Sequence, residues 1–371
     1  MESQAGSGRV EYIDGLRAVA IAAVLLFHAG IWATSSGGSK VLGYGHLGVD
    51  LFFVVSGFCM VWPVLQRGET AVAPKGFWRR RFLRVALPFW PVLFAAIAAS
   101  FFVYTLGGPS WWNQPQQDVF PITPSIVPDL VTHLALLHGF FLDYVHSIDG
   151  AFWSLSAEWQ FYVVFPFLWL ASRHWSLRTV AGTGLCISWG FAIAINRTHA
   201  DVSDALLPWW LGTFCMGMLA AGVAHHQDRF RQPILIAGAG AALVALPLEW
   251  IKGPGYVLSR PLWAVAFSAL VLASSEGPLR SALTVPAVRR LGLCSYSAYL
   301  IHGTVFMLMS VPMSRDAWPQ SARIVSYFFV GIPLVVVLAW AYYQRVELPA
   351  HRLARRGPKP RSTDRLGGFQ C

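Results

Sequence analysis

The stretch DGLRAVAIAAVLLFH, residues 14 to 28, is typical of an apolar helix, yet it carries Asp14, Arg17 and His28, which membrane helices normally exclude. At 100° per residue, the step from Arg17 to His28 leaves about 20° beyond three full turns, so both side chains point along one stripe. His28 then lies roughly 16 Å deeper than Arg17, near the middle of a bilayer if Arg17 marks its surface. An ionisable group at that depth indicates a functional site, although a histidine hydrogen-bonded between helices is the structural alternative.

The composition indicates a polytopic membrane protein. Of the 371 residues, 55% are hydrophobic and 12% are charged, and the mean hydropathy is +0.51. No soluble core absorbs that much apolar sequence. The formal charge of +10 does not indicate nucleic acid as a partner, because the basic residues cluster in alternate loops, as orientation in a lipid bilayer requires. We therefore predict an all-α, polytopic transmembrane helix bundle in the cell (cytoplasmic) membrane.

The distribution of Lys and Arg over the loops decides between ten and eleven membrane spans. The apolar segment 130–145 is short and holds two histidines and an aspartate. If it does not span, most of the 28 Lys and Arg residues fall on the side of the two termini, which the positive-inside rule makes cytoplasmic. We therefore predict that 130–145 is re-entrant or lies in the interface. The ten predicted spans are 14–34, 47–66, 85–106, 152–172, 179–196, 205–223, 232–250, 260–275, 291–311 and 323–343.

Two further motifs follow the first span. In GHLGVDLFFVVSGF, residues 45 to 58, the glycines allow close helix approach, and Asp50 is either a helix cap or the partner of a buried cation. The run FWRRRFLRVALPFW, residues 77 to 90, contains Arg81 and Arg84 one turn apart. Membrane anchoring alone explains such a basic run, but a pair of guanidinium groups also suits a phosphorylated cytoplasmic ligand.

Two more motifs lie in later spans. In DGAFWSLSAEWQFYVVFP, residues 149 to 166, Glu158 lies four residues after Ser154 and four before Tyr162, so the three share a helix face. A glutamate inside a membrane helix implies a partner or a water-filled cavity. In LGLCSYSAYLIHGTVF, residues 291 to 306, Tyr299 and His302 are one turn apart. The five cysteines show no metal-ligand spacing, so no metal site is predicted.

Taken in order, these motifs resemble the bacterial acyltransferase-3 family of integral-membrane O-acyltransferases. The family carries Arg or Lys, ten residues and then His in its first helix, which Arg17 and His28 match. Its arginine pair matches Arg81 and Arg84, and its serine–glutamate segment matches residues 154–158. The resemblance extends over nearly the whole chain. The matching pieces are YIDGLRAVAI (12–21), GVDLFFVVSGF (48–58), FWRRRFLR (77–84), FWSLSAEWQFY (152–162), GLCSYSAYLIH (292–302) and VELP (346–349).

The resemblance implies transfer of an acyl group, usually acetyl, from acyl-coenzyme A on the cytoplasmic side, with no permanently bound cofactor. It implies that the coenzyme phosphates dock on Arg81 and Arg84. The implied acceptor is a sugar hydroxyl on a surface polysaccharide, peptidoglycan, a lipid-linked glycan or a glycosylated small molecule such as a macrolide. Many members add a C-terminal SGNH-type esterase domain, which is not expected in this chain. We expect a membrane-embedded acyltransferase domain at 1–343 and a basic cytoplasmic tail at 344–371.

The mechanistic hypothesis makes neutral His28 the general base on the acceptor hydroxyl, because imidazole exchanges protons near neutral pH. Glu158 or Asp50 would orient the ring and stabilise its protonated form. Arg17 would hold the coenzyme or the cytoplasmic mouth. An acyl-enzyme relay remains open. The candidates for stabilising the oxyanion or carrying the acyl group are Ser154, Tyr162 and Tyr299, among which the sequence does not choose.

The competing hypothesis is a transporter that uses intramembrane Asp, Arg, His and Glu as a proton or substrate pathway. Transporters typically show internal repeats and interrupted helices in matching halves. This sequence shows no such repeat, and its polar groups gather in the first half. A structural membrane protein with satisfied polar groups is the third alternative. Slow hydrolysis of acetyl-coenzyme A that depends on His28 and Arg81 would distinguish the enzyme from both.

Overall fold

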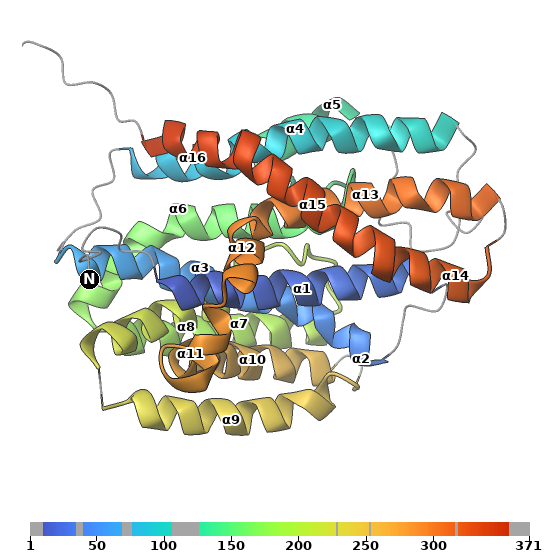
Figure 1. The fold of residues 1–371 in the computed structure, drawn as a ribbon. Coiled ribbons are helices and arrows are strands. Elements are labelled where there is room, and N and C mark those ends of the chain that lie inside the picture. Colours follow the sequence, from blue (N-terminus) through green and yellow to red (C-terminus); the bar gives the residue numbers. More distant parts are fainter. Residues whose placement is uncertain are drawn as a thin grey trace, which may run out of the picture.

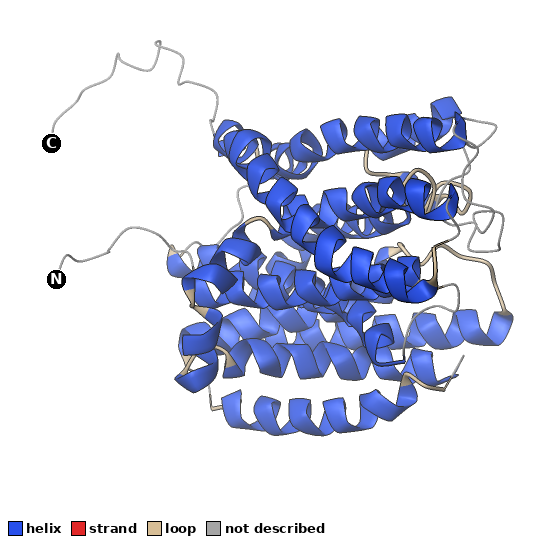
Figure 2. Ribbon diagram, turned by 45° about the vertical axis from the view of Figure 1, so that its right-hand side comes forward, coloured by secondary structure: helices blue, strands red, loops and turns tan. Residues whose placement is uncertain are grey.

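The computed structural model describes residues 10–34, 40–68, 76–105, 126–227, 229–251, 254–315 and 318–355, and all regular elements among them are helices (Figures 1 and 2). The predicted all-α class is therefore confirmed. The long helices are α1 (Glu11–Ala33), α3 (Leu47–Gln66), α4 (Phe77–Thr105), α6 (Trp153–His174), α7 (Leu177–Thr198), α8 (Leu207–His226), α9 (Arg231–Leu248), α10 (Pro254–Ala273), α13 (Ser295–Arg315) and α15 (Ile332–Tyr342). The short ones are α2 (Lys40–Gly43), α5 (Ile126–Leu134), α11 (Gly277–Leu283), α12 (Pro286–Leu293), α14 (Gln320–Val325) and α16 (Leu348–Arg355).

The helices agree with a multi-pass membrane protein. Within the described part of the chain, seven helices are long and apolar enough to cross a membrane, or up to nine if two bent helix pairs each form one span. The bent pairs are α10 with α11, at 89°, and α12 with α13, at 66°. Each of the ten predicted spans coincides with a helix. The span at 152–172 is present as α6 but is not among the nine, because Glu158 and Gln160 lower its mean hydropathy.

The segment 130–145 does not form a spanning helix. Helix α5 ends at Leu134, and the chain continues as turns, a 3-10 helix at His138–Phe140 and more turns up to Asp149. Leu136 and Ile148 adopt left-handed backbone conformations, with φ of 59° and 64°, which break any helical path through this stretch. The charge argument therefore predicted correctly that this apolar run does not cross the membrane as a helix.

The first and last described residues lie at the same end of the bundle (Figures 1 and 2). We call this the basic end, because α1 and the arginine run of α4 begin there and α16 finishes there. The last span is longer than predicted: it runs as one apolar helical stretch of 35 residues, Gln320–Ala354, through π-helical turns at Ser326–Gly331 and Tyr343–Glu347. The expected boundary at residue 343 thus falls inside this helix, and residues 356–371 of the expected tail lie outside the described residues.

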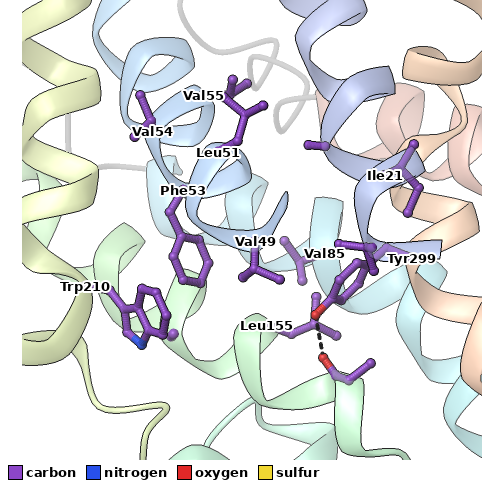
Figure 3. Packing of buried hydrophobic residues seen from close by; sticks show 14 of the residues in the cluster. Ile21, Val49, Leu51, Phe53, Val54, Val55, Val85, Leu155, Trp210 and Tyr299 are labelled. Carbon is purple, nitrogen blue, oxygen red and sulfur yellow. Dashed lines mark hydrogen bonds between the residues drawn. The ribbon is translucent and has the colours of Figure 1, made fainter. Parts of the chain in front are cut away.

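Close helix packing depends on glycines, as the sequence predicted. A Cβ atom on Gly45 or Gly48 would overlap backbone carbonyl oxygens of α1. Helices α3 and α8 approach each other through Gly57 and Gly217, where a Cβ atom would overlap the partner helix's backbone. Beside this contact, the Phe53 ring packs 5.0 Å from Trp210 between ring centroids (Figure 3). The small residues bring the backbones together, and the aromatic side chains fill the remaining space.

Gly57→Ala should therefore destabilise the protein by about 1–3 kcal/mol, because the added methyl group overlaps the carbonyl oxygen of Phe214 and must push α3 away from α8. Gly190→Ala, on α7, is the matched control, since no atom lies within 4 Å of its added Cβ. Thermal unfolding of both variants in detergent measures the difference. A Gly57→Ala variant that unfolds at the same temperature as Gly190→Ala would show that the α3–α8 contact is not needed for stability.

Candidate active site

His28 lies on α1, half-buried, with its ring fixed by the backbone of its own helix. Its Nδ1 is 3.0 Å from the carbonyl oxygen of Val24, one turn earlier. Because a carbonyl only accepts hydrogen bonds, Nδ1 is protonated, and in the neutral ring Nε2 therefore presents a lone pair. The ring centroid is 5.0 Å from that of Phe27 and 4.7 Å from that of His302. A neutral imidazole with a fixed Nδ1–H and a free Nε2 is the form that accepts a proton.

Tyr299 and Ser154 join α13 to the start of α6, and the Tyr299 ring lies 5.6 Å from that of His302 between centroids. The Tyr299 hydroxyl donates to the Ala151 carbonyl oxygen at 2.7 Å, and the Ser154 hydroxyl lies 2.7 Å from the Tyr299 oxygen. Since the phenol has one proton, Ser154 is the donor in the second bond. Both side chains are buried. Tyr299 therefore already uses its proton, and this limits its predicted role as an oxyanion donor.

Glu158 and Tyr162 form a second group one to two turns closer to the basic end. Glu158 Oε1 accepts hydrogen bonds from Ser56 Oγ at 2.8 Å and from the Tyr162 hydroxyl at 2.5 Å. The Arg81 guanidinium lies 5.4 Å from the centroid of the Tyr162 ring, which allows a cation–π contact. The sequence correctly placed Glu158 and Tyr162 on one face of α6. Their partners come from α3 and α4, which no spacing within α6 could reveal.

Arg17 connects α1 to this second group. Its guanidinium is 3.9 Å from the Asp14 carboxylate and donates to Cys59 Sγ at 3.5 Å. It also interacts electrostatically with Glu158. The carboxylates compensate much of the cost of placing a half-buried guanidinium among apolar helices. The predicted stripe on α1 is thus present, with an ion pair at the basic end and His28 three turns deeper.

Comparison of the sequence with known proteins identifies the family of this chain. The sequence profile of the acyltransferase-3 family, an acyltransferase domain, matches residues 10–344. The protein belongs to this family. The match runs from the residue before α1 to just past the end of α15, and so includes His28, Arg81 and Arg84. No solved structure matches the chain.

Curated relatives of this acyltransferase carry names consistent with the family. The chain is 25% identical to the acyltransferase MdmB of Streptomyces mycarofaciens, over 96% of this chain and 95% of that protein. It is 24% identical to the O-acetyltransferase OatA of Staphylococcus aureus strain NCTC 8325 / PS 47, over 92% of this chain and 57% of that protein. The chain thus spans little more than half the length of the staphylococcal relative, and nearly all of the streptomycete one. The protein is an O-acyltransferase.

Neither carboxylate predicted to orient His28 does so in this acyltransferase. Glu158 bonds to Ser56 and Tyr162, and no described hydrogen bond or ion pair joins it to His28. Asp50 is buried and interacts electrostatically with Arg260 and His46. Of the two alternatives left open by the sequence, this interaction favours Asp50 as the partner of a cation, the half-buried Arg260. The group that orients His28 is the Val24 carbonyl, and residue types carry no signal for such a backbone contact.

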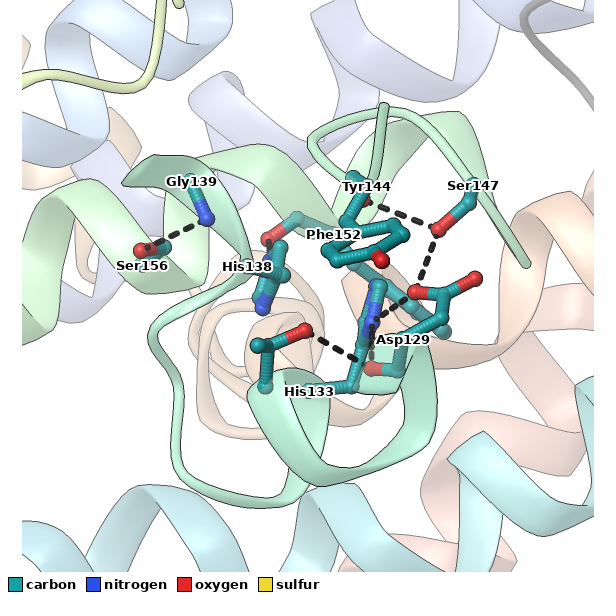
Figure 4. Close-up of polar contacts among 9 residues, drawn as sticks. Asp129, His133, His138, Gly139, Tyr144, Ser147, Phe152 and Ser156 are labelled. Atoms are coloured by element: carbon teal, nitrogen blue, oxygen red, sulfur yellow. Dashed lines mark hydrogen bonds and ion pairs between the residues drawn. The ribbon is translucent and has the colours of Figure 1, made fainter. Parts of the chain in front are cut away.

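The non-spanning segment supports the start of α6 through a buried polar network (Figure 4). His133 lies 2.9 Å from the Asp129 carboxylate, and its ring stacks on that of His138 at 4.0 Å. His138 Nε2 donates to the Phe152 carbonyl at 3.0 Å. Burial and the neighbouring His133 lower the pKa of His138 well below its ordinary value, so its ring is neutral at pH 7. The network fixes the backbone that presents the Ala151 carbonyl to Tyr299.

A further buried carboxylate, Glu347, was missed by the sequence analysis. Its Oε2 accepts a hydrogen bond from Ser297 at 2.5 Å, and it interacts electrostatically with Arg84 and Arg17. Its position falls in the expected tail at 344–371, although it lies in the VELP piece of the family resemblance. Arg84 thus interacts electrostatically with Glu347, while Arg81 packs against Tyr162 of the Glu158 group. The two arginines of the predicted pair are set between carboxylates at the basic end.

Proposed function

We propose that this O-acyltransferase takes an acetyl or other acyl group from acyl-coenzyme A at the basic end of the bundle and passes it to a sugar hydroxyl, with His28 as general base. The observation that carries the proposal is the state of His28: Nδ1 is bound to the Val24 carbonyl, so Nε2 accepts a proton. The basic end then faces the cytoplasm, in accordance with the positive-inside rule, in the cell membrane.

The arginines at the start of α4 support a phosphorylated donor. Arg79 and Arg80 are exposed, whereas Arg81 and Arg84 are half-buried. Arg81 interacts electrostatically with Glu158, and Arg84 with Glu347. Coenzyme A carries phosphates at one end and its thioester at the end of a flexible arm. With the phosphates on Arg81 and Arg84, the arm needs to reach the level of His28, roughly 16 Å below Arg17. Guanidinium groups suit phosphates because they donate two parallel hydrogen bonds.

The transfer itself needs one base and one leaving group. His28 Nε2 takes the proton of the acceptor hydroxyl as its oxygen attacks the thioester carbonyl carbon. A tetrahedral oxyanion forms and collapses, the carbon–sulfur bond breaks, and the thiolate of coenzyme A takes the proton from His28. The products are the ester and free coenzyme A. Direct transfer suits the site better than an acyl relay through Tyr299, because the Tyr299 hydroxyl donates its proton to the Ala151 carbonyl, which cannot act as a base.

The acceptor class follows from the family resemblance: a hydroxyl of a surface polysaccharide, a lipid-linked glycan or a glycosylated natural product such as a macrolide. The staphylococcal relative is named an O-acetyltransferase, which supports acetyl transfer to oxygen.

Purified protein in detergent, given acetyl-coenzyme A, tests the donor. We expect slow release of free thiol even without an acceptor, because water can replace the hydroxyl, and faster release when extracted glycans or secreted metabolites of the producing strain are added. Mass spectrometry of the products identifies the acceptor by its gain of an acetyl mass. Absence of thiol release both with and without these extracts would overturn the proposed donor.

A further inference from the structure

His302 is a second histidine at the centre of the bundle, facing the proposed base from α13. Its side chain is fully buried, and its ring centroid lies 4.7 Å from that of His28 with the planes tilted by 57°. A buried imidazole that packs against a second imidazole is expensive unless its nitrogen atoms find partners. The partners of its two nitrogen atoms therefore decide what His302 is able to bind.

Only one nitrogen atom of His302 has a partner among the described residues. Nδ1 lies 2.6 Å from the Tyr299 carbonyl oxygen, so Nδ1 carries the proton. Nε2 is then a bare lone pair, and it is buried without a hydrogen-bond partner. His28 has the same tautomer, fixed in the same way by the Val24 carbonyl. The site thus contains two adjacent imidazoles that each present an unprotonated Nε2.

In both rings the Nε2 edge is turned away from the carbonyl that holds Nδ1. Helices α1 and α13 run in parallel, away from the basic end (Figure 1). In each ring, Nδ1 bonds to a carbonyl of the preceding turn of its own helix. Nε2 lies on the other edge of the imidazole, and the two rings lie against each other where α1 meets α13. A ligand that reaches one Nε2 is therefore close to the second imidazole.

We propose that His302 binds the hydroxyl adjacent to the one that is acylated, so that the enzyme selects a vicinal diol such as two neighbouring hydroxyls of a sugar ring. A hydroxyl has one proton to donate, so a single alcohol satisfies one Nε2 and leaves the other buried without a partner. A vicinal diol supplies one proton to each: His28 takes the proton of the attacking hydroxyl, and His302 accepts a hydrogen bond from its neighbour. This inference rests on the proposed function and specifies the acceptor for it.

The test compares two probes, trans-1,2-cyclohexanediol and cyclohexanol, as acceptors of the acetyl group of acetyl-coenzyme A. The purified wild-type enzyme is expected to prefer the diol by about 10- to 100-fold in kcat/KM, because the mono-alcohol leaves the His302 Nε2 unpaired. His302→Phe keeps a planar ring but has no hydrogen-bond acceptor, so its ratio of kcat/KM for the diol to kcat/KM for cyclohexanol should fall to nearly one. His302→Gln, which can place an amide oxygen near the Nε2 position, should restore part of the preference.

Thr304→Val is the matched control, because it removes a buried hydroxyl from the same helix and should keep the wild-type preference. Binding of acetyl-coenzyme A, measured by isothermal titration calorimetry, should be unchanged in His302→Phe. A diol preference that survives in His302→Phe, or a wild type that acetylates both probes equally, would overturn the assignment of His302 while leaving the donor and base intact. A wild type that neither binds nor consumes acetyl-coenzyme A would instead overturn the proposed function.

Discussion

His28→Ala is expected to lower acetyl transfer by about 10²- to 10⁴-fold, the usual contribution of a positioned general base, while the protein still inserts and folds. Folding should survive because the ring is only half-buried and its one polar contact is to its own helix. The measurement is acetyl transfer to the diol probe by purified variant and wild type at matched concentrations. If His28 acts as a base, added free imidazole should restore part of the lost rate by occupying the vacated space.

His225→Ala supplies the control for removing a histidine from a membrane helix. His225 lies at the end of α8 with its ring against Trp62, and no described hydrogen bond, ion pair or ring contact joins it to His28. Its substitution should leave the transfer rate within about twofold of wild type. An active His28→Ala variant would contradict the scheme, and the pair His28→Ala and His225→Ala would then have the same rate.

The sequence was sufficient to predict the spans and the faces of the helices, because apolar length and 3.6-residue periodicity report burial directly. It placed Arg17 and His28 on one stripe and Glu158 beside Tyr162, and the structure agrees. The sequence could not predict which side chains meet between different helices. Glu158 was considered as a partner for His28, yet its hydrogen bonds come from Ser56 on α3 and from Tyr162 on its own helix.

Two features of the site could not be predicted from the residue types. The Val24 carbonyl that fixes the tautomer of His28 is a backbone group, which any residue at that position would supply. Glu347 follows a long apolar run and precedes basic residues, so charge placed it outside the membrane domain. The helix continues past it to Arg355, and the side chain turns back to Ser297. Charge marks where a bilayer ends and not where a helix ends.

Arg81→Ala should raise the KM for acetyl-coenzyme A by about 10- to 100-fold, because a charge-assisted hydrogen bond to a phosphate contributes about 1.5–3 kcal/mol. Arg81→Lys should recover only part of this, since an ammonium keeps the charge but lacks the planar pair of donors. The measurement is the initial rate of thiol release as a function of acetyl-coenzyme A concentration. For wild type, KM should also rise with salt concentration, as expected of a contact between arginine and phosphate.

The control for Arg81 is Arg197→Ala, an exposed arginine at the end of α7 opposite to the basic end, which should leave KM unchanged. Arg81 also packs against Tyr162 and interacts with Glu158, so its loss could act through that group instead. Glu158→Gln distinguishes loss of a phosphate contact from disturbance of the Glu158 group. It removes the negative charge that interacts with Arg81 but keeps a hydrogen-bond acceptor. If Arg81 binds the donor, Arg81→Ala changes mainly KM, whereas Glu158→Gln changes it little. Equal losses of kcat in both variants, with KM unchanged, would make Arg81 a positioning residue of the Glu158 group and move the phosphate site elsewhere.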